Sequence, residues 1–280
     1  MFTTDYYFLV AGLREWTLDS DTKGFDVREI KQEILDELSK SDRKCVEMLY
    51  AYYDCENIVA RRTGSTRYNQ LGNLTVEQID EVFQQRNYKL LPESVAKVVK
   101  LYVEAEDEDR DEEIVLDDTF EHALFDAYYR GLASSGCRFL AGWGEFDRNL
   151  RNIAAAVAAR EAGRQVKDVV VGAGDIVEQL SRSSAADFGL RGELPYIDAV
   201  IAAVSDEKNI VEKERKIDAI RWAEAENIAV FDFFNINFIL SYLVKVNIVA
   251  RWTLLSPEVG RQMLDRLIKE LDAKNLVNKQ

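Results

Sequence analysis

Residues that break helices are scarce in this sequence. Its 280 residues include only 3 prolines and 14 glycines. Because proline removes a backbone donor and glycine costs conformational entropy, their scarcity argues against a chain dominated by turns. Alanine, leucine, glutamate and arginine, which are strong helix formers, are abundant. The composition therefore predicts long helices and an all-α fold.

Cysteine and histidine are also rare. Cys45, Cys55 and Cys137 are odd in number and lack metal-ligand spacing, which favours buried, reduced thiols in a cytosolic protein. His122 is the only histidine, and no serine or cysteine has a setting typical of catalysis. A single histidine on a helix is more often packed or exposed than catalytic. We therefore expect no catalytic residue, no cofactor-binding residue, no cofactor and no metal.

Positive charge and long apolar runs are lacking as well. The 36 lysines and arginines are outnumbered by 50 acidic residues, which gives a net charge of −14. This balance argues against a nucleic-acid partner and against direct docking on anionic lipid. The first five residues lack the positive start of a signal peptide, and no apolar run is long enough for a membrane span.

The sequence does contain an internal repeat. Residues 57–61 and 247–251 are the same pentapeptide, Asn-Ile-Val-Ala-Arg, and residues 152–156 are a weaker copy. The first and second asparagines are 95 residues apart, and so are the second and third. Equal spacing in a chain close to three periods long predicts three copies of one helical unit.

An acidic stretch divides the chain. Between residues 104 and 118 there are ten acidic residues and one basic residue, and such blocks repel themselves and stay solvated. We therefore predict an acidic linker at 104–118. Three helical units, with a repeat period of about 95 residues, are predicted at 1–103, 119–192 and 206–280.

Helix start signals recur in the three units. Each unit is expected to contain a long helix that carries the asparagine, then a connection, then a capped amphipathic helix. Thr75 opens a capping-box pattern, and Asp175 is expected to cap the second such helix. Ser256, followed by Pro257, opens the most regular apolar stripe of the chain.

Three further patterns concern single elements. Residues 228–255 are apolar nearly all round, which predicts a buried helix. The glycines that flank Trp143 predict a turn at residues 142–144 between two helices. Residues 6–13 are apolar, but the stretch is too short for periodicity to decide between strand and helix.

The repeated polar residues are expected to serve packing. Asparagine is a poor helix-interior residue because its side chain competes for backbone hydrogen bonds. Its presence in three apolar helices suggests that the amide bridges buried backbone groups, since an unpaired amide would cost about 1–3 kcal/mol. An arginine follows four residues later in two copies and is displaced in the second. The predicted structural anchors are Asn57, Arg61, Asn152, Arg160, Asn247 and Arg251.

One acidic cluster supports a different hypothesis. Asp117, Asp118 and Glu121 resemble the aspartate-rich helix that holds magnesium in prenyl-diphosphate enzymes. Such a site needs a second acidic cluster across a helical bundle, and the sequence offers no persuasive one. A solvated helix start is the preferred interpretation, and a magnesium-dependent helical enzyme is an alternative.

Three motifs in order resemble a known family. The V/A-type ATPase C-subunit family has a signature in which acid-x-x-Asn-Ile is followed by an arginine and then by Gly-x-Leu. The stretch at residues 54–62, together with residues 72–75, is similar to this signature. The member of this family in eukaryotic V-ATPases is called the d-subunit. Residues 120–129 resemble the second-unit helix of that family, and residues 238–251 resemble its third. On these motifs the chain is similar to a short, divergent, bacterial-type member.

This resemblance implies an all-helical funnel of three units in a pseudo-threefold arrangement, without an active site. The protein would be a non-catalytic central-stalk subunit that couples the rotor shaft to the membrane rotor ring, for ATP-linked transport of protons or sodium ions. Its partners would be another protein of the central stalk and the rotor ring. It would be cytoplasmic and peripheral to the inner membrane, with membrane contact only through the ring. A free-standing helical scaffold or adaptor protein is the alternative from another class.

Overall fold

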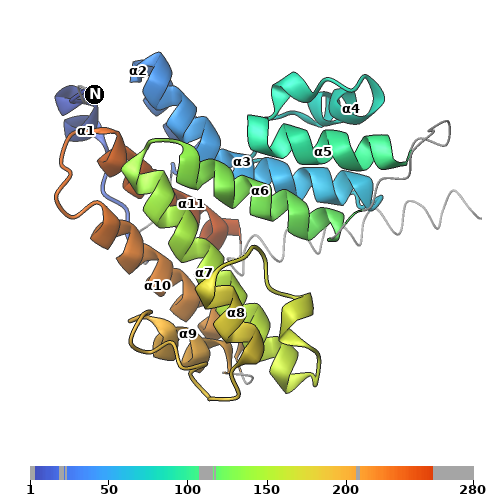
Figure 1. The fold of residues 1–280 in the computed structure, drawn as a ribbon. Coiled ribbons are helices and arrows are strands. Elements are labelled where there is room, and N and C mark those ends of the chain that lie inside the picture. The colour runs from blue at the N-terminus through green and yellow to red at the C-terminus, as the bar shows by residue number, and fades with distance from the viewer. Residues whose placement is uncertain are drawn as a thin grey trace, which may run out of the picture.

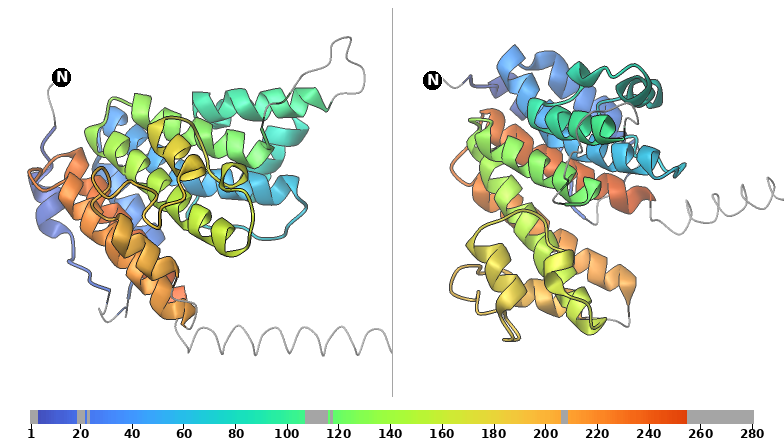
Figure 2. Two further views of the ribbon diagram at one scale, coloured as in Figure 1. Left: turned by 60° about the horizontal axis from the view of Figure 1, so that its bottom comes forward. Right: turned by 45° about the vertical axis from the view of Figure 1, so that its right-hand side comes forward.

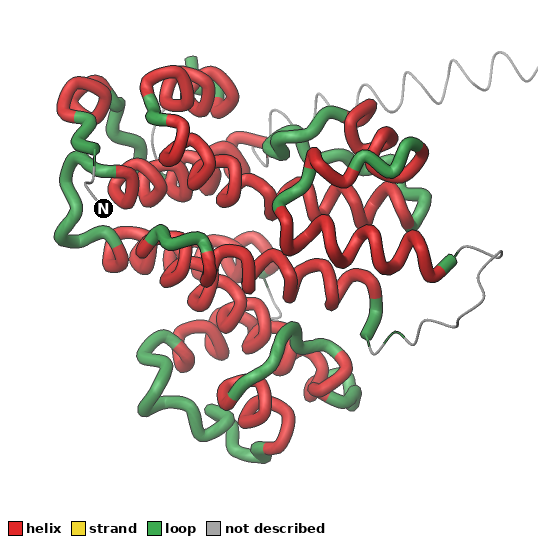
Figure 3. The backbone as a smooth tube through the Cα atoms, turned by 45° about the horizontal axis from the view of Figure 1, so that its top comes forward, coloured by secondary structure: helices red, strands yellow, loops and turns green. Residues whose placement is uncertain are grey.

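The computed structural model describes residues 4–18, 22, 24–106, 116, 118–205 and 209–254. In these ranges the chain forms helices and loops without a β-strand (Figure 3), which confirms the all-α prediction there. The α-helices are α1 (Tyr7–Gly12), α2 (Val27–Glu37), α3 (Lys40–Arg62), α4 (Val76–Gln84), α5 (Glu93–Ala105), α6 (Phe120–Ser134), α7 (Arg138–Glu161), α8 (Asp175–Arg182), α9 (Ile197–Val204), α10 (Ile210–Ile228) and α11 (Ile236–Leu254). Short 3₁₀ turns lie at η1 (Tyr88–Leu90) and η2 (Val166–Asp168).

Two long helices organise the packing. Helix α6 packs on α3, α5 and α7, and α7 packs in turn on α8, α9, α10 and α11. In Figure 1 the helices α3, α5 and α6 run side by side across the upper part of the molecule, while α7 runs down toward α8 and α9. The buried apolar side chains form one continuous core.

Local signals explain several helix starts. The predicted capping box is confirmed, because Thr75 Oγ1 accepts from the backbone N–H of Gln78 and the Gln78 side chain accepts from the N–H of Thr75. Helix α3 is capped by Ser39. Asp175 is the first helical residue of α8 and follows the N-cap Gly174, so the prediction that Asp175 is the cap is wrong by one position. The ambiguous apolar stretch at the N-terminus is helical, as α1.

The predicted turn at residues 142–144 is wrong, since these residues lie inside α7. A Cβ added at Gly144 would stand 2.9 Å from Leu132 Cδ1 of α6, closer than real Cβ contacts. Gly142 faces the Ile228 side chain at the end of α10. Gly144 therefore allows α7 to approach α6 closely, whereas a Cβ at Gly142 would make only ordinary contact with Ile228, and the helix tolerates the modest conformational cost of both glycines.

The predicted division into units stays a prediction. Most of the acidic linker and the predicted last helix, which begins near Ser256, lie outside the described residues. Helices from either side of the linker pack directly, since α5 and α3 both contact α6. Tyr128 Oη in α6 also donates to the Leu49 carbonyl of α3 at 3.2 Å. The described residues do not show a pseudo-threefold funnel of three repeated units.

None of the described helices is long and apolar enough to cross a membrane.

Candidate functional site

The first predicted anchor holds the connection that follows its own helix. The Asn57 side chain of α3 accepts from the backbone N–H of Asn69 at 2.6 Å and donates to the Asn69 carbonyl at 2.9 Å. One turn earlier, Asp54 Oδ1 accepts from the backbone N–H groups of Asn73 and Leu74. A Cβ at Gly72 would stand 2.6 Å from Asp54 Oδ1, so glycine is required for this close approach.

The second anchor repeats this geometry in α7. The Asn152 side chain accepts from the N–H of Val171 at 2.8 Å and donates to the Val171 carbonyl at 2.9 Å. Asn57 and Asn152 are both buried. The prediction that the asparagine amides bridge backbone groups is therefore confirmed at these two positions.

The arginines of these two copies reach the helix that follows the connection. Arg61 of α3 pairs with Asp80 of α4. Arg160 of α7 donates to the carbonyls of Ser183 and Ala185 after the C-terminus of α8. Each asparagine thus holds a loop, and the arginine after it holds the helix beyond that loop.

The third copy has different partners. Asn247 of α11 is buried, and its Oδ1 accepts from the Tyr50 hydroxyl of α3 at 2.9 Å. Arg251 binds both carboxylate oxygens of Asp218 in α10, at 3.0 and 2.9 Å, and also pairs with Glu214. The connection that would correspond to those of the first two copies lies outside the described residues. The six anchors do not converge on one site, and their contacts hold helices and loops in place.

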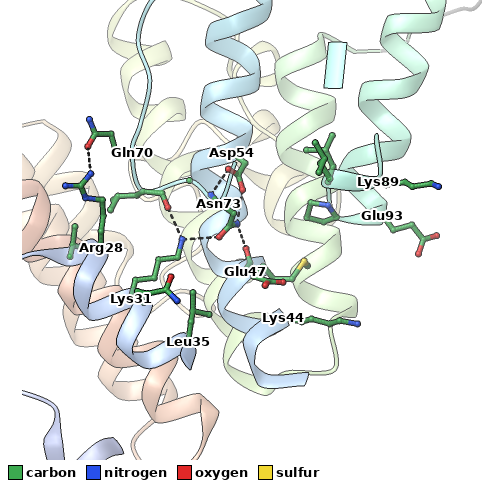
Figure 4. Close-up of a pocket in the computed structure, with 18 residues that line it drawn as sticks. Arg28, Lys31, Leu35, Lys44, Glu47, Asp54, Gln70, Asn73, Lys89 and Glu93 are labelled. Carbon is green, nitrogen blue, oxygen red and sulfur yellow. Dashed lines mark hydrogen bonds between the residues drawn. The ribbon is translucent and has the colours of Figure 1, made fainter. Parts of the chain in front are cut away.

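A cleft opens beside the first anchor (Figure 4). It has a volume of about 840 Å³ and lies between α2, α3, the loop at 70–73 and the segment at 89–93. Its apolar lining comprises Val27, Leu35, Met48, Leu71, Leu90, Leu91 and Pro92. Its charged lining comprises Arg28, Lys31, Lys44, Glu47, Asp54, Lys89 and Glu93.

Lys31 is the most enclosed base of this cleft. Its Nζ donates to Asn73 Oδ1 at 3.0 Å and to the Leu71 carbonyl at 3.3 Å, and it lies 3.9 Å from the centre of the Tyr50 ring. Burial lowers the pKa of Lys31 to about 8, although Asp54 and Glu47 attract its charge. Burial raises the pKa of Asp54, against the hydrogen bonds from Leu74 and Asn73. Lys31 of α2 therefore holds the loop at 70–73, which forms one wall of the cleft, against α2.

The residues of the magnesium hypothesis do not form a site in the described structure. Asp118 accepts from the N–H of Thr119 at 2.7 Å and lies 3.3 Å from His122 Nδ1. Asp117 lies outside the described residues. Among the residues described, no group of three or more histidine, cysteine or acidic side chains is arranged to hold a metal ion.

An exposed aromatic cluster lies at one end of the molecule, where α1 meets the connection between α10 and α11 (Figures 1 and 2). The backbone N–H of Tyr6 donates to the Phe234 carbonyl at 2.6 Å, and the Tyr7 and Phe234 rings are 4.5 Å apart. We call this surface the aromatic end; its large exposed side chains are Tyr7, Phe8, Val230, Phe231, Phe233 and Phe234. Phe8 is 97% exposed and Phe231 is 86% exposed.

A family model described as "Protein of unknown function (DUF2764)" matches residues 3–275. The chain belongs to the DUF2764 family. The resemblance to the V/A-type ATPase C-subunit family is therefore wrong as a family assignment. Its first motif is a local packing motif, since Asp54, Asn57 and Gly72 hold the loop after α3 in place. No curated protein and no solved structure matches this DUF2764 chain.

Sequence reasoning missed a buried ion network in the DUF2764 protein. Asp147 of α7 accepts from Arg151 at 2.8 Å and from the Tyr129 hydroxyl at 2.9 Å. Burial alone would raise the pKa of Asp147, but the guanidinium groups of Arg151 and Arg221 outweigh it and lower that pKa. Arg221 also pairs with Asp218, so the network joins α7 to α10 and, through Arg251, to α11. Charged residues spaced three or four apart in apolar helices were the available signal.

The aromatic end was missed for a different reason. Residues 228–255 read as one apolar helix, but α11 begins only at Ile236 and residues 229–235 form a loop. The prediction of a buried helix is therefore wrong for this loop. Asp232 and Asn235, which favour turns, were the local signal for it.

Proposed function

We propose that this DUF2764 protein is a non-catalytic coupling subunit that joins two partner proteins and transmits movement between them. The observation that carries the proposal is the aromatic end. Its exposed large apolar side chains come from two segments that touch at Tyr7 and Phe234, and groups of exposed apolar side chains are typical of interaction sites. Burying a phenylalanine side chain contributes about 1.5–3 kcal/mol, so several together would anchor a partner firmly.

The loop that presents these rings is braced by hydrogen bonds and an ion pair of Asp232. Asp232 Oδ1 accepts from Asn235 Nδ2 at 2.7 Å and from Asn237 Nδ2 at 3.2 Å. The other carboxylate oxygen of Asp232 pairs with Arg138 at the start of α7. A surface that is already ordered loses little conformational entropy on binding. This preorganisation favours a binding role for the aromatic end.

The anchors support the mechanical part of the proposal. Asn57 and Asn152 bind their loops directly, and the Asp147–Asp218 network crosslinks three long helices. Such contacts make the body resist deformation, which a subunit that transmits movement requires. The polar residues that the sequence marks most strongly are thus engaged in packing.

As the assembly we propose a rotary V/A-type ATPase, with another protein of the central stalk and the membrane rotor ring as the two partners. The protein would be cytoplasmic, peripheral to the inner membrane, and in contact with the membrane only through the ring. The predicted funnel of three units belongs to this proposal, because three similar units around an axis would form a socket for a stalk. Support comes from the equal spacing of the asparagines, the acidic charge and the aromatic end. A free-standing adaptor with other partners is the alternative.

Affinity purification of the tagged protein from mildly solubilised membranes tests this proposal. We expect rotary ATPase subunits with the wild type, and loss of one of the two partners with Phe8→Ser/Phe231→Ser. The matched control is Leu101→Ser/Val211→Ser, which removes exposed apolar side chains from α5 and α10. It should retain both partners.

Each outcome bears on a separate part of the proposal. Absence of every rotary ATPase subunit from the wild-type sample would overturn the assembly. Equal recovery of both partners with the phenylalanine variant would overturn the role of the aromatic end.

A further inference from the structure

The cleft beside the first anchor is basic although the protein is strongly acidic. Its lining includes four bases, Arg28, Lys31, Lys44 and Lys89, in a chain of net charge −14. They come from three separate segments: α2, α3 and η1. A local excess of positive charge on an acidic protein favours the binding of a negatively charged ligand at that surface.

The acidic groups of the cleft are largely engaged. Asp54 accepts hydrogen bonds from Asn73 and Leu74. Glu93 pairs with Lys97 at 2.7 Å, and Lys97 is not among the lining residues. Glu47 is the remaining acid of the lining. The lining thus holds four bases and three acids, an excess of one positive charge in a chain of net charge −14.

Two of the bases are available to a ligand. Lys44 and Lys89 form no hydrogen bond or ion pair with any part of the chain that the structure describes. Figure 4 shows them on one side of the cleft, with Arg28 on the opposite side. Arg28 makes only a long hydrogen bond of 3.5 Å to Gln70 and an exposed contact with Asp26 at 3.7 Å. An incoming carboxylate could therefore pair with Lys44 and Lys89 without breaking an ion pair within the described chain.

Apolar side chains also line the cleft. They include Leu35 of α2, Met48 of α3 and Leu71 of the loop. The loop wall is fixed by Lys31 and by the Asp54 and Asn57 contacts, so the cleft is formed before anything binds. Its volume of about 840 Å³ lies in the range of sites that accept sizeable ligands.

We propose that this cleft binds an acidic segment of a partner protein. The apolar side chains of the segment would lie on Leu35, Met48 and Leu71, and its carboxylates would pair with Arg28 on one side and with Lys44 and Lys89 on the other. A compact anion would need bases that converge on one point, whereas Arg28 lies on one side of the cleft and Lys44 and Lys89 lie on the other (Figure 4). The inference rests on the proposed function in that the segment belongs to a coupled partner.

Fluorescence anisotropy with a labelled peptide of alternating glutamate and leucine tests the inference on the purified full chain. We expect binding that weakens as salt rises. Lys44→Glu/Lys89→Glu should weaken binding by about tenfold or more, and Lys44→Arg/Lys89→Arg should retain it. The matched control, Arg164→Glu/Lys167→Glu, makes the same charge change at exposed residues away from the cleft and should leave binding unchanged. Thermal melting checks that each variant is folded.

Three results would overturn the inference. One is equal binding of a glutamate–serine peptide, which would mean that the apolar lining of the cleft plays no part. Another is unchanged binding by the Lys44→Glu/Lys89→Glu variant. The third is an equal loss in the control variant, which would assign the effect to overall charge. The peptide assay needs no ATPase, so it can succeed or fail independently of the co-purification experiment.

Discussion

Asn57 and Asn152 each place a polar amide in the interior of a long helix, although asparagine does not favour helix formation. Each amide instead supplies one donor and one acceptor to a single loop residue, Asn69 or Val171. The asparagine thereby pairs the backbone N–H and carbonyl of that loop residue, which would otherwise lack partners where the loop lies against the helix. An asparagine suits this role because its amide presents both a donor and an acceptor.

Replacing Asn57 by leucine should destabilise the fold by about 1–3 kcal/mol, because it leaves the N–H and carbonyl of Asn69 without their partner. Asn247→Leu should have a similar effect through the Tyr50 hydroxyl. The free energy of unfolding from urea titration measures both. Asn227→Leu, at an exposed site near the end of α10, is the control and should change it by less than about 0.5 kcal/mol. Unchanged stability in Asn57→Leu would refute the bridging role.

At the scale of elements, α7, α10 and α11 are joined by charges as well as by apolar packing. Asp218 is buried and binds Arg221, Arg251 and the indole Nε1 of Trp252, the last at 2.9 Å. Removing one member of such a buried network leaves the others charged and unpaired, which is far more costly than losing a surface ion pair. Asp218 is therefore a main link between α10 and α11.

Asp218→Ala should lower the free energy of unfolding by about 3–5 kcal/mol. Asp198→Ala, which removes the exposed partner of Arg191, is the control and should cost about 0–1 kcal/mol. Chemical denaturation compares the two. A loss for Asp218→Ala no larger than that of the control would contradict the importance given to the network.

Some elements could be predicted from the sequence because their signals are local. The capping box at Thr75 and the amide bridges of Asn57 and Asn152 depend on residues near in sequence. The glycines near Trp143 were misjudged because their reason is tertiary: α6 packs where the Cβ of Gly144 would be. The partners of Arg251 were also unpredictable, since they depend on how α10 lies against α11.

At the scale of the whole molecule, two surfaces differ in chemistry. The aromatic end is formed by α1 and the loop before α11, whereas the basic cleft is lined by α2, α3 and the segment at 89–93. The two surfaces share no residue. Neither surface could be predicted from the sequence, because each joins segments that only the fold brings together. Two surfaces of different chemistry are what a coupling subunit requires.

ATP-driven ion transport in inverted inner-membrane vesicles from a strain that lacks the gene tests the coupling role most directly, with ATP hydrolysis measured in the same vesicles. The coupling role predicts that hydrolysis persists while transport is lost. The wild-type gene should restore transport, and the gene carrying Phe8→Ser/Phe231→Ser should not. ATP-driven transport at the wild-type level in vesicles that lack the protein would contradict the proposed function.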